Sequence, residues 1–373
     1  MEFGRIFWFW VLSVGEVQMG FSLCSYPAIF NFGDSNSDTG GMSATFLPIP
    51  PPNGESFFGR PSGRACDGRL VVDFMAEHLG LPYLSPYLDS IWPNFGHGAN
   101  FATGGSTIRP QNKTLFEAGV SPFSLNVQLW QFDQFKSRTI DLYNRANPDE
   151  RSYLPKLEDF SNALYTIDIG QNDLTAGFRK MSEDQVQASI PEILDQFSDA
   201  VQRLYQLGAR IFWIHNTGPI GCLPMTGIYF GGSSDLLDQL GCVRSHNDMA
   251  VEFNTQLKDR VCQLRGQLNQ TSLIYVDVYA AKYGLISDAV NQGFTDPLHI
   301  CCGYHELVIV GCGQKINVNG TEIYGASCGN PSTYVSWDGT HYSQAANHWI
   351  ANSIFNGTLS DPQIPIDEAC NFM

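Results

Sequence analysis

Short apolar stretches alternate along the chain with longer segments whose apolar residues recur at helical spacing. The apolar stretches lack a strict alternation with polar residues, which is typical of parallel strands buried on both faces. The longer segments show the pattern of helices that bury one face. The expected strands lie at residues 28–32, 163–167, 210–214 and 272–276, and the expected helices at 69–79, 185–207 and 244–268. This order predicts an α/β protein, a three-layer α/β/α sandwich around a mainly parallel sheet.

The chain shows no convincing internal repeat or interdomain linker, so we expect one domain. Its 373 residues, 43% of them hydrophobic, suffice for a large core and exclude a disordered chain. Residues 1–25 differ from the rest: Arg5 precedes an apolar run at 6–12, and Glu16 and Gln18 end the run before it is long enough to span a bilayer. We expect a secretory signal peptide at 1–25 and a single domain at 26–373. The protein would be secreted to the extracellular space or cell wall, with no stable membrane insertion.

The charge balance excludes one class of partner. Lys and Arg number 21 against 37 Asp and Glu, so the net charge is −16, and no Lys/Arg-rich run appears. Proteins that bind nucleic acid need a basic surface. The sequence therefore predicts no nucleic-acid partner, and it leaves the oligomeric state open.

Cysteines and glycosylation acceptors support secretion. Ten cysteines concentrate in the C-terminal half, and in an oxidising compartment they predict disulfides. If Cys24 leaves with the signal peptide, nine remain and at least one is unpaired; the isolated Cys66 is the candidate. Four Asn-x-Ser/Thr triplets predict N-glycosylation. Their acceptors are Asn112, Asn269, Asn319 and Asn356.

A zinc site is the alternative to disulfides near residue 300. The side chains concerned are His299, Cys301, Cys302, His305 and Cys312. No cysteine pair has the Cys-x₂-Cys spacing of a zinc knuckle. We therefore predict disulfides here and no metal site.

Polar or glycine-rich turns follow the expected strands, and the carboxyl ends of parallel strands are where such sheets carry their chemistry. Ser35 follows a Gly-Asp pair directly after the first strand, and residues 100–106 form a second glycine-rich turn. Asn172 follows another strand, where its amide can donate to an oxyanion. Asp338 and His341 are close enough for one loop to present both, with the carboxylate orienting the imidazole. Serine, imidazole and carboxylate together predict nucleophilic attack on an acyl group.

These segments resemble the GDSL esterase/lipase family of SGNH hydrolases, most of all its secreted plant branch, over residues 27–355. The family's motif blocks correspond to residues 32–35, Gly104, 170–173 and 338–341. Asn36 stands where the name-giving motif has Leu. The resemblance implies the SGNH hydrolase fold, with a flavodoxin-like sheet, and a reaction that needs no metal or organic cofactor.

The same resemblance implies a role for each matching residue. Ser35 would attack an ester carbonyl, His341 would take its proton, and Asp338 would hold the imidazolium. The backbone N–H groups of Ser35 and Gly104 and the amide of Asn172 would bind the oxyanion. The expected partner is a small-molecule or glycan ester, such as an acyl or acetyl ester of a carbohydrate, lipid or specialised metabolite.

Two other functions remain open at this point. The same residues would serve an acyltransferase in which an alcohol replaces water, and a non-catalytic glycan-binding or defence protein is a further alternative. A second serine, Ser327, lies in a Gly-x-Ser-x-Gly sequence, the nucleophile motif of α/β-hydrolases. That motif requires a strand before it and a helix after it, and the Asn-Pro-Ser that follows predicts a loop instead.

Overall fold

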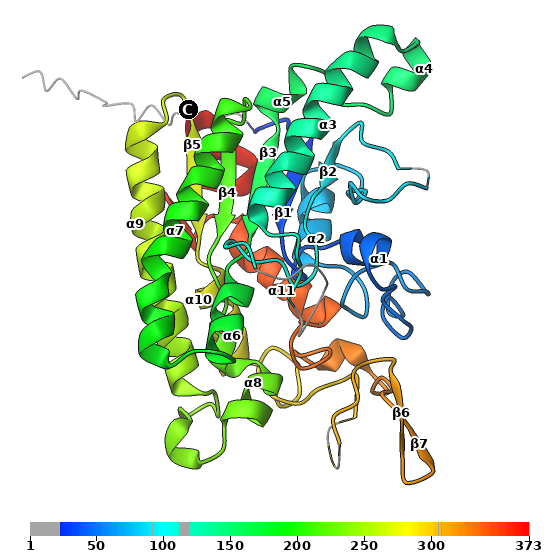
Figure 1. Cartoon of the computed structure of the whole chain (residues 1–373), viewed down its shortest axis with the longest axis vertical. Coiled ribbons are helices and arrows are strands. Elements are labelled where there is room, and N and C mark those ends of the chain that lie inside the picture. Colours follow the sequence, from blue (N-terminus) through cyan, green and yellow to red (C-terminus); the bar gives the residue numbers. More distant parts are fainter. Residues whose placement is uncertain (1–22, 92, 112–119, 305, 307, 373) are drawn as a thin grey trace, which may run out of the picture.

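A six-stranded sheet in the order β2-β1-β3-β4-β5-β8 forms the centre of the molecule (Figure 1). The computed structural model describes residues 23–91, 93–111, 120–304, 306 and 308–372. The first five strands run parallel, in the flavodoxin-like order, and β8 is antiparallel to β5. β6 and β7 form a separate hairpin. The strands are β1 Ile29–Gly33, β2 Gly98–Asn100, β3 Leu164–Asp168, β4 Ile211–His215, β5 Ser272–Val276, β6 Lys315–Val318, β7 Thr321–Tyr324 and β8 Ser360–Asp361.

Helices cover both faces of this sheet. α7 packs between α3 and α9 on one face, and α11 packs between α2 and α10 on the other (Figure 1). This arrangement confirms the predicted three-layer α/β/α sandwich. The helices are α1 Gly41–Thr45, α2 Val71–His78, α3 Leu125–Arg145, α4 Pro148–Arg151, α5 Asp159–Asn162, α6 Gln171–Phe178, α7 Glu183–Gln206, α8 Pro224–Phe230, α9 Arg244–Gln267, α10 Val278–Ser287 and α11 Gln344–Phe355.

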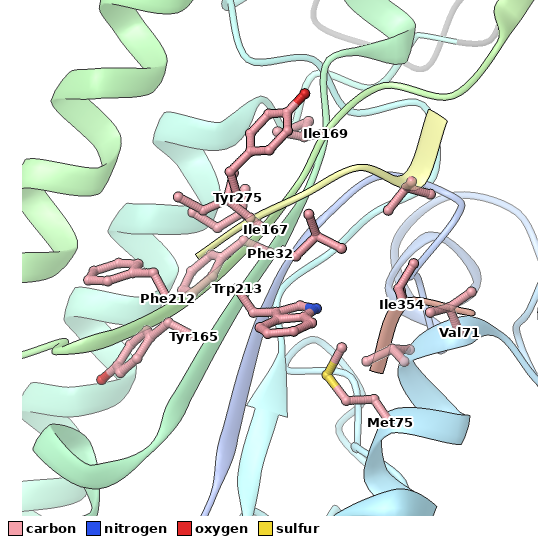
Figure 2. Close-up of a cluster of buried hydrophobic side chains, with 14 of the residues drawn as sticks. Phe32, Val71, Met75, Tyr165, Ile167, Ile169, Phe212, Trp213, Tyr275 and Ile354 are labelled. Carbon is pink, nitrogen blue, oxygen red and sulfur yellow. The ribbon is translucent and has the colours of Figure 1, made fainter. Parts of the chain in front are cut away.

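The core lies on both sides of the central strands. Consecutive strand residues point to opposite faces, so Phe212 and Trp213 of β4 bury their rings in different layers. Trp213 lies toward Met75 of α2 and Ile354 of α11 (Figure 2), and all four side chains are almost completely buried. Burial of one such apolar side chain stabilises the fold by roughly 1.5–3 kcal/mol. The sheet is therefore a rigid base for the loops at its edge.

The predicted strands and helices are confirmed, with ends shifted by at most two residues. The strand expected at 272–276 is β5, and the helix expected at 244–268 is α9. One apolar residue of that helix departs from the helical pattern: Val251 is 46% exposed. Leu257 and Val261 of the same helix are buried as expected. The helical pattern thus located the buried face of this helix correctly, except at Val251.

Eight cysteines form disulfides, and two remain free. Cys66 is free and buried, as predicted, and Cys262 is free and exposed. The pairs are Cys24–Cys370, Cys222–Cys242, Cys301–Cys328 and Cys302–Cys312. The cysteines that the zinc alternative required are therefore used in disulfides, and no group of three potential ligands gathers in the part of the chain that the structure describes.

The N-terminal segment differs from expectation in one respect. Cys24 was expected to leave with the signal peptide, but it is bonded to Cys370, and its N–H donates to the carbonyl oxygen of Asp367 at 2.6 Å. The full chain thus has four disulfides and two free thiols, whereas the odd count was expected for a chain that has lost Cys24. Residues 1–22 lie outside the described residues. Among the helices that are described, none is long and apolar enough to cross a membrane.

Candidate active site

The carboxyl ends of β1 and β3 meet at one edge of the sheet. Gly33, the last residue of β1, pairs in register with Asp168, the last residue of β3. The chain leaves β1 directly into Ser35, and it leaves β3 into α6, whose first turn carries Asn172. The order β2-β1-β3 places the chain's change of direction at β1, which is where ligands bind in open parallel sheets. The fold therefore brings Ser35 and Asn172 together as the sequence predicted.

Ser35, His341 and Asp338 form a continuous chain of hydrogen bonds. His341 Nε2 lies 2.8 Å from Ser35 Oγ, and its Nδ1 lies 2.6 Å from Asp338 Oδ2. The other oxygen of Asp338 accepts from the backbone N–H groups of Thr340 at 2.9 Å and His341 at 2.7 Å. These bonds hold the imidazole in one orientation, with a ring nitrogen toward the serine hydroxyl. The geometry is that of a serine nucleophile, a base and a carboxylate that orients the base.

Electrostatics couple the imidazole and the carboxylate. Burial lowers the pKa of His341, but the adjacent Asp338 carboxylate outweighs burial, so the pKa of His341 is raised above its ordinary value. Burial raises the pKa of Asp338, but the interaction with His341 outweighs it and the net pKa is lowered. Asp338 is therefore ionised at neutral pH and stabilises positive charge on the ring. That is the charge state that a general base needs as it takes a proton.

The loop that carries Asp338 and His341 is held in place by contacts with segments that do not belong to the central sheet. Gly339 between them has φ of 88°, and a side chain there would collide with Met225. The preceding Trp337 is completely buried, and its indole N–H donates to Asn53 Oδ1 at 2.8 Å. Its carbonyl oxygen accepts from the Cys302 N–H at 2.6 Å. Trp337 packs with the two disulfides of this region, which fix the loop where no strand or helix holds it.

The Asp38 carboxylate accepts a hydrogen bond from Gly104, one of the expected oxyanion donors. It accepts from the Gly104 N–H at 2.8 Å and from three N–H groups of residues 40–42 at the start of α1. Gly104 lines the cleft, as expected, but its N–H points to this carboxylate instead of into the cleft. The expectation for Gly104 as a donor is corrected accordingly. Within the described residues, the N–H groups of Ser35 and Gly105 make no hydrogen bond, and both residues line the cleft.

The Asn172 amide is held beside the serine by two acceptors. Its Nδ2 donates to Asp34 Oδ2 at 3.1 Å and to the carbonyl oxygen of Ser106 at 3.0 Å. The other oxygen of Asp34 accepts from the backbone and side-chain N–H groups of Asn36, each at 2.9 Å. Asp34 thus connects the turn that carries Ser35 to the amide expected to bind an oxyanion. An oxyanion would replace one of the two present acceptors of Asn172.

A cleft of about 360 Å³ opens over these groups. It is larger than a single acetyl group requires, and its walls are partly apolar. The polar wall includes Gln171, Thr175 and Arg179 of α6 and its end. The apolar wall is contributed by α1, α6, α8 and the loops that follow β1 and β2: Met42, Ile49, Val120, Ala176, Leu223, Met225, Tyr229 and Phe230.

Other residues singled out by the sequence lie elsewhere. Ser327 lies in a loop, as expected. His215, which ends β4, is buried, and its Nδ1 lies 3.3 Å from Asp168 Oδ2. Of the glycosylation acceptors, Asn269, Asn319 and Asn356 are exposed, and Asn112 lies outside the described residues. The sequence did not single out Asp38 or Asn53 as cleft residues. Their positions depend on contacts between segments that are distant in the sequence, which the local pattern does not show. For Asn53, the sequence shows only that it follows a Pro-Pro pair.

The family model for GDSL-like lipases and acylhydrolases matches residues 29–354. The chain therefore belongs to this family of carboxylic ester hydrolases.

Three relatives illustrate its place in the family. A GDSL esterase/lipase of Arabidopsis thaliana is 56% identical over 93% of this chain and 90% of its own length. A GDSL esterase/lipase of Zea mays is 51% identical over 93% of this chain and 90% of its own length. A further Arabidopsis relative, named alpha-L-fucosidase 3, is 51% identical over 90% of this chain and 91% of its own length.

Proposed function

We propose that this protein is a secreted serine esterase that cleaves carboxylic esters through Ser35, His341 and Asp338. The observation that carries the proposal is the hydrogen-bond chain from the Ser35 hydroxyl through both nitrogens of His341 to the Asp338 carboxylate. These three hydrogen-bonded side chains line a cleft that is large enough for an ester whose acyl group is larger than acetyl. Nucleophile, base and orienting carboxylate within hydrogen-bond reach are what acyl transfer to serine needs.

The first half of the reaction forms an acyl-enzyme. Ser35 Oγ attacks the ester carbonyl carbon while its proton moves to His341 Nε2, and Asp338 stabilises the resulting imidazolium. The N–H groups of Ser35 and Gly105, which make no hydrogen bond among the described residues, and the Asn172 amide would bind the oxyanion. The tetrahedral intermediate then collapses, and the imidazolium donates its proton to the departing alcohol. Donors held in place before the reaction stabilise the developing charge more than mobile water does.

The second half releases the acid. His341, neutral again, takes a proton from a water molecule, which attacks the acyl carbon of the Ser35 ester. The same donors bind the second oxyanion, and Ser35 Oγ leaves with the proton held by the imidazolium. In an acyltransferase, an alcohol would take the place of this water.

The relative named as a fucosidase makes glycoside cleavage a competing function. Most glycosidases use two carboxyl groups that flank the scissile bond. Among the described residues that line the cleft, the acidic ones are Asp38 and Asp338. Asp38 is bonded to backbone N–H groups and Asp338 to His341. Neither is free to protonate a leaving group or to attack a sugar, which favours ester hydrolysis.

A series of p-nitrophenyl esters from acetyl to palmitoyl tests the proposal against this alternative. We expect the wild type and Ser327→Ala to hydrolyse members of the series, and Ser35→Ala to lose turnover while remaining folded by circular dichroism. Ser327→Ala is the matched control, because it removes a hydroxyl from the other hydrolase-like motif. Hydrolysis of p-nitrophenyl α-L-fucoside that survives in Ser35→Ala would contradict the esterase. Labelling by a fluorophosphonate without turnover would instead favour acyl transfer to an alcohol.

Secretion is supported by the disulfides and by the apolar N-terminal run. Because Cys24 pairs with Cys370, we infer that signal cleavage precedes Cys24 and not the sequence-predicted boundary after residue 25. The N-terminal sequence of protein collected from culture medium tests this inference. A mature chain that starts after Cys24 would contradict it.

A further inference from the structure

One face of α8 forms part of the cleft wall. The residues of α8 that line the cleft are Met225, Thr226, Tyr229 and Phe230, whereas Ile228 is not among the lining residues and is 45% exposed. Positions spaced by one, four and five residues lie on the same side of a helix that has 3.6 residues per turn. No residue of α8 is charged. This face, which we call the α8 wall, therefore offers apolar and aromatic surface to a substrate.

The α8 wall is held in place at both ends. At its start, the Met225 N–H donates to the carbonyl oxygen of Gly339 at 3.0 Å, in the loop of the proposed base. At its end, the Phe230 ring centre lies 4.7 Å from that of His246 on α9, and the His246 ring stacks on Phe178 of α6 at 3.8 Å. The Phe230 ring thus has its place before a substrate binds, which limits the side-chain entropy that binding costs.

The chemistry of ester cleavage places the alcohol part of the substrate on this side of the cleft. When the tetrahedral intermediate collapses, the bond between the carbonyl carbon and the alcohol oxygen breaks, the electron pair leaves with the oxygen, and the His341 imidazolium donates its proton to that oxygen. The alcohol oxygen must therefore lie beside His341, whose loop contacts the start of α8. From Met225 to Phe230 the helix rises about 7.5 Å, which leaves room for a ring linked to the ester oxygen.

The oxyanion donors lie at a different wall. Gly105, whose N–H is one of the proposed donors, follows Gly104, and a side chain added at Gly104 would approach within 2.7 Å of Met42 Sδ on α1. α1 lies apart from α8 (Figure 1). The carbonyl oxygen therefore points toward α1 and the alcohol oxygen toward the loop beside α8. The acyl group, bonded to the same carbon, takes a third direction.

We propose that the α8 wall binds the alcohol part of the ester, and that this part is an uncharged alcohol with an aromatic ring. This proposal rests on the esterase function proposed above. Aromatic rings pair favourably when their centres lie about 4.5–7 Å apart, and Tyr229 and Phe230 offer two rings to such a partner. The polarizable sulfur of Met225 also packs well against aromatic rings. Phe230 is thus a specificity-determining residue, and Tyr229, which is 57% exposed, contributes at the rim.

Two isomeric esters test the proposal. Benzyl acetate carries its ring on the alcohol part, and methyl phenylacetate carries the same ring on the acyl part. We expect Phe230→Ala to lower the ratio of kcat/KM for benzyl acetate to kcat/KM for methyl phenylacetate roughly tenfold, the size expected for the loss of one aromatic contact. Titration of the released acid at constant pH measures both esters in the same way.

A second variant and a control belong to the same helix. Tyr229→Ala should lower the same ratio by a smaller factor, about threefold, because the ring is partly exposed. It also keeps the proposal testable if Phe230→Ala does not fold, since Tyr229 has little packing to lose. The matched control is Ile228→Ala, which removes an apolar side chain of α8 that does not line the cleft. Its ratio should equal that of the wild type.

Three results would overturn the role of the α8 wall alone. The first is an unchanged ratio in the folded Phe230→Ala and Tyr229→Ala variants. The second is a raised ratio, which would place the acyl group on this wall. The third is a greater loss for octyl acetate than for benzyl acetate, which would assign the wall to a straight-chain alcohol.

The proposed function fails in a different way. If no ester is cleaved in a reaction that depends on Ser35, both the esterase and the role of the α8 wall are overturned. If Ser35-dependent cleavage of other esters occurs without cleavage of benzyl acetate, only the role of the α8 wall is overturned. A selective loss for benzyl acetate in both variants supports the proposal.

Discussion

The two halves of the candidate active site are held by different means. Ser35 follows β1, a fully buried strand that is bonded to a parallel strand on each side. Asp338 and His341 lie in a loop that belongs to no strand or helix. That loop is held by buried Trp337 and by the disulfides around it. The sheet half therefore depends on the core, and the loop half depends on covalent cross-links.

The distribution of cysteines follows this difference. In the sheet half, the turn that carries Ser35 is fixed by hydrogen bonds such as the pair between Gln128 and the backbone of Gly33. Near the loop half, adjacent Cys301 and Cys302 bond to two different partners. A strand edge needs no disulfide to place a side chain, whereas an irregular loop pays conformational entropy for every ordered residue. Four predictions follow the comparison between the halves.

The largest effect is expected from the loop half. His341→Ala removes the base while the sheet half stays intact, so Ser35 keeps its position but loses the acceptor for its proton. Because the groups act as a unit, we expect kcat to fall roughly 10⁶-fold, as much as in Ser35→Ala. Ester hydrolysis by the two single variants and the double variant measures this. Losses that multiply in the double variant would show that the halves act independently.

A smaller effect is expected at the sheet edge. Asn172→Ala removes one oxyanion donor and leaves the serine and imidazole in place, so kcat should fall about 10²–10³-fold with KM little changed. Fluorophosphonate labelling should persist at a reduced rate, because the nucleophile and base remain. A loss confined to KM would mean that Asn172 binds the substrate and not the transition state.

Removing one disulfide separates stability from activity. The bond between Cys24 and Cys370 spans 346 residues and that between Cys301 and Cys328 spans 27. On loop entropy alone, replacing the first pair by serine costs about 5 to 6 kcal/mol of unfolding free energy and the second about 3 to 4 kcal/mol. We expect the reverse order for activity, with a loss of up to about 10²-fold for the second pair because the loop shifts. Urea unfolding and kcat on both double variants test this reversal.

The smallest effect concerns pH. His341 takes a proton only when neutral, and Asp338 raises its pKa above the ordinary 6.5. Activity should therefore be full at alkaline pH and fall as pH decreases through this raised value, approaching tenfold for each further pH unit. The kcat/KM profile of the wild type measures this limb. A midpoint below 6.5 would contradict the coupling of His341 to Asp338.

The sheet half was easier to predict from the sequence than the loop half. Buried strands are locally encoded as apolar runs, so β5 was located correctly and Ser35 was placed at a strand end from the chain pattern alone. The disulfide partners of Cys301 and Cys302 were not predictable, because pairing depends on how distant loops meet. The engagement of Gly104 by Asp38 was missed for the same reason, since it joins the turns after two different strands.

Ser35 is the proposed nucleophile of ester cleavage. Fluorophosphonate reacts covalently with an activated serine, and peptide mass spectrometry locates the adduct. We expect an adduct on Ser35 in the active wild type, none on Ser327, and none in His341→Ala. An active protein whose adduct lies on Ser327, or which carries no adduct on Ser35, would contradict it.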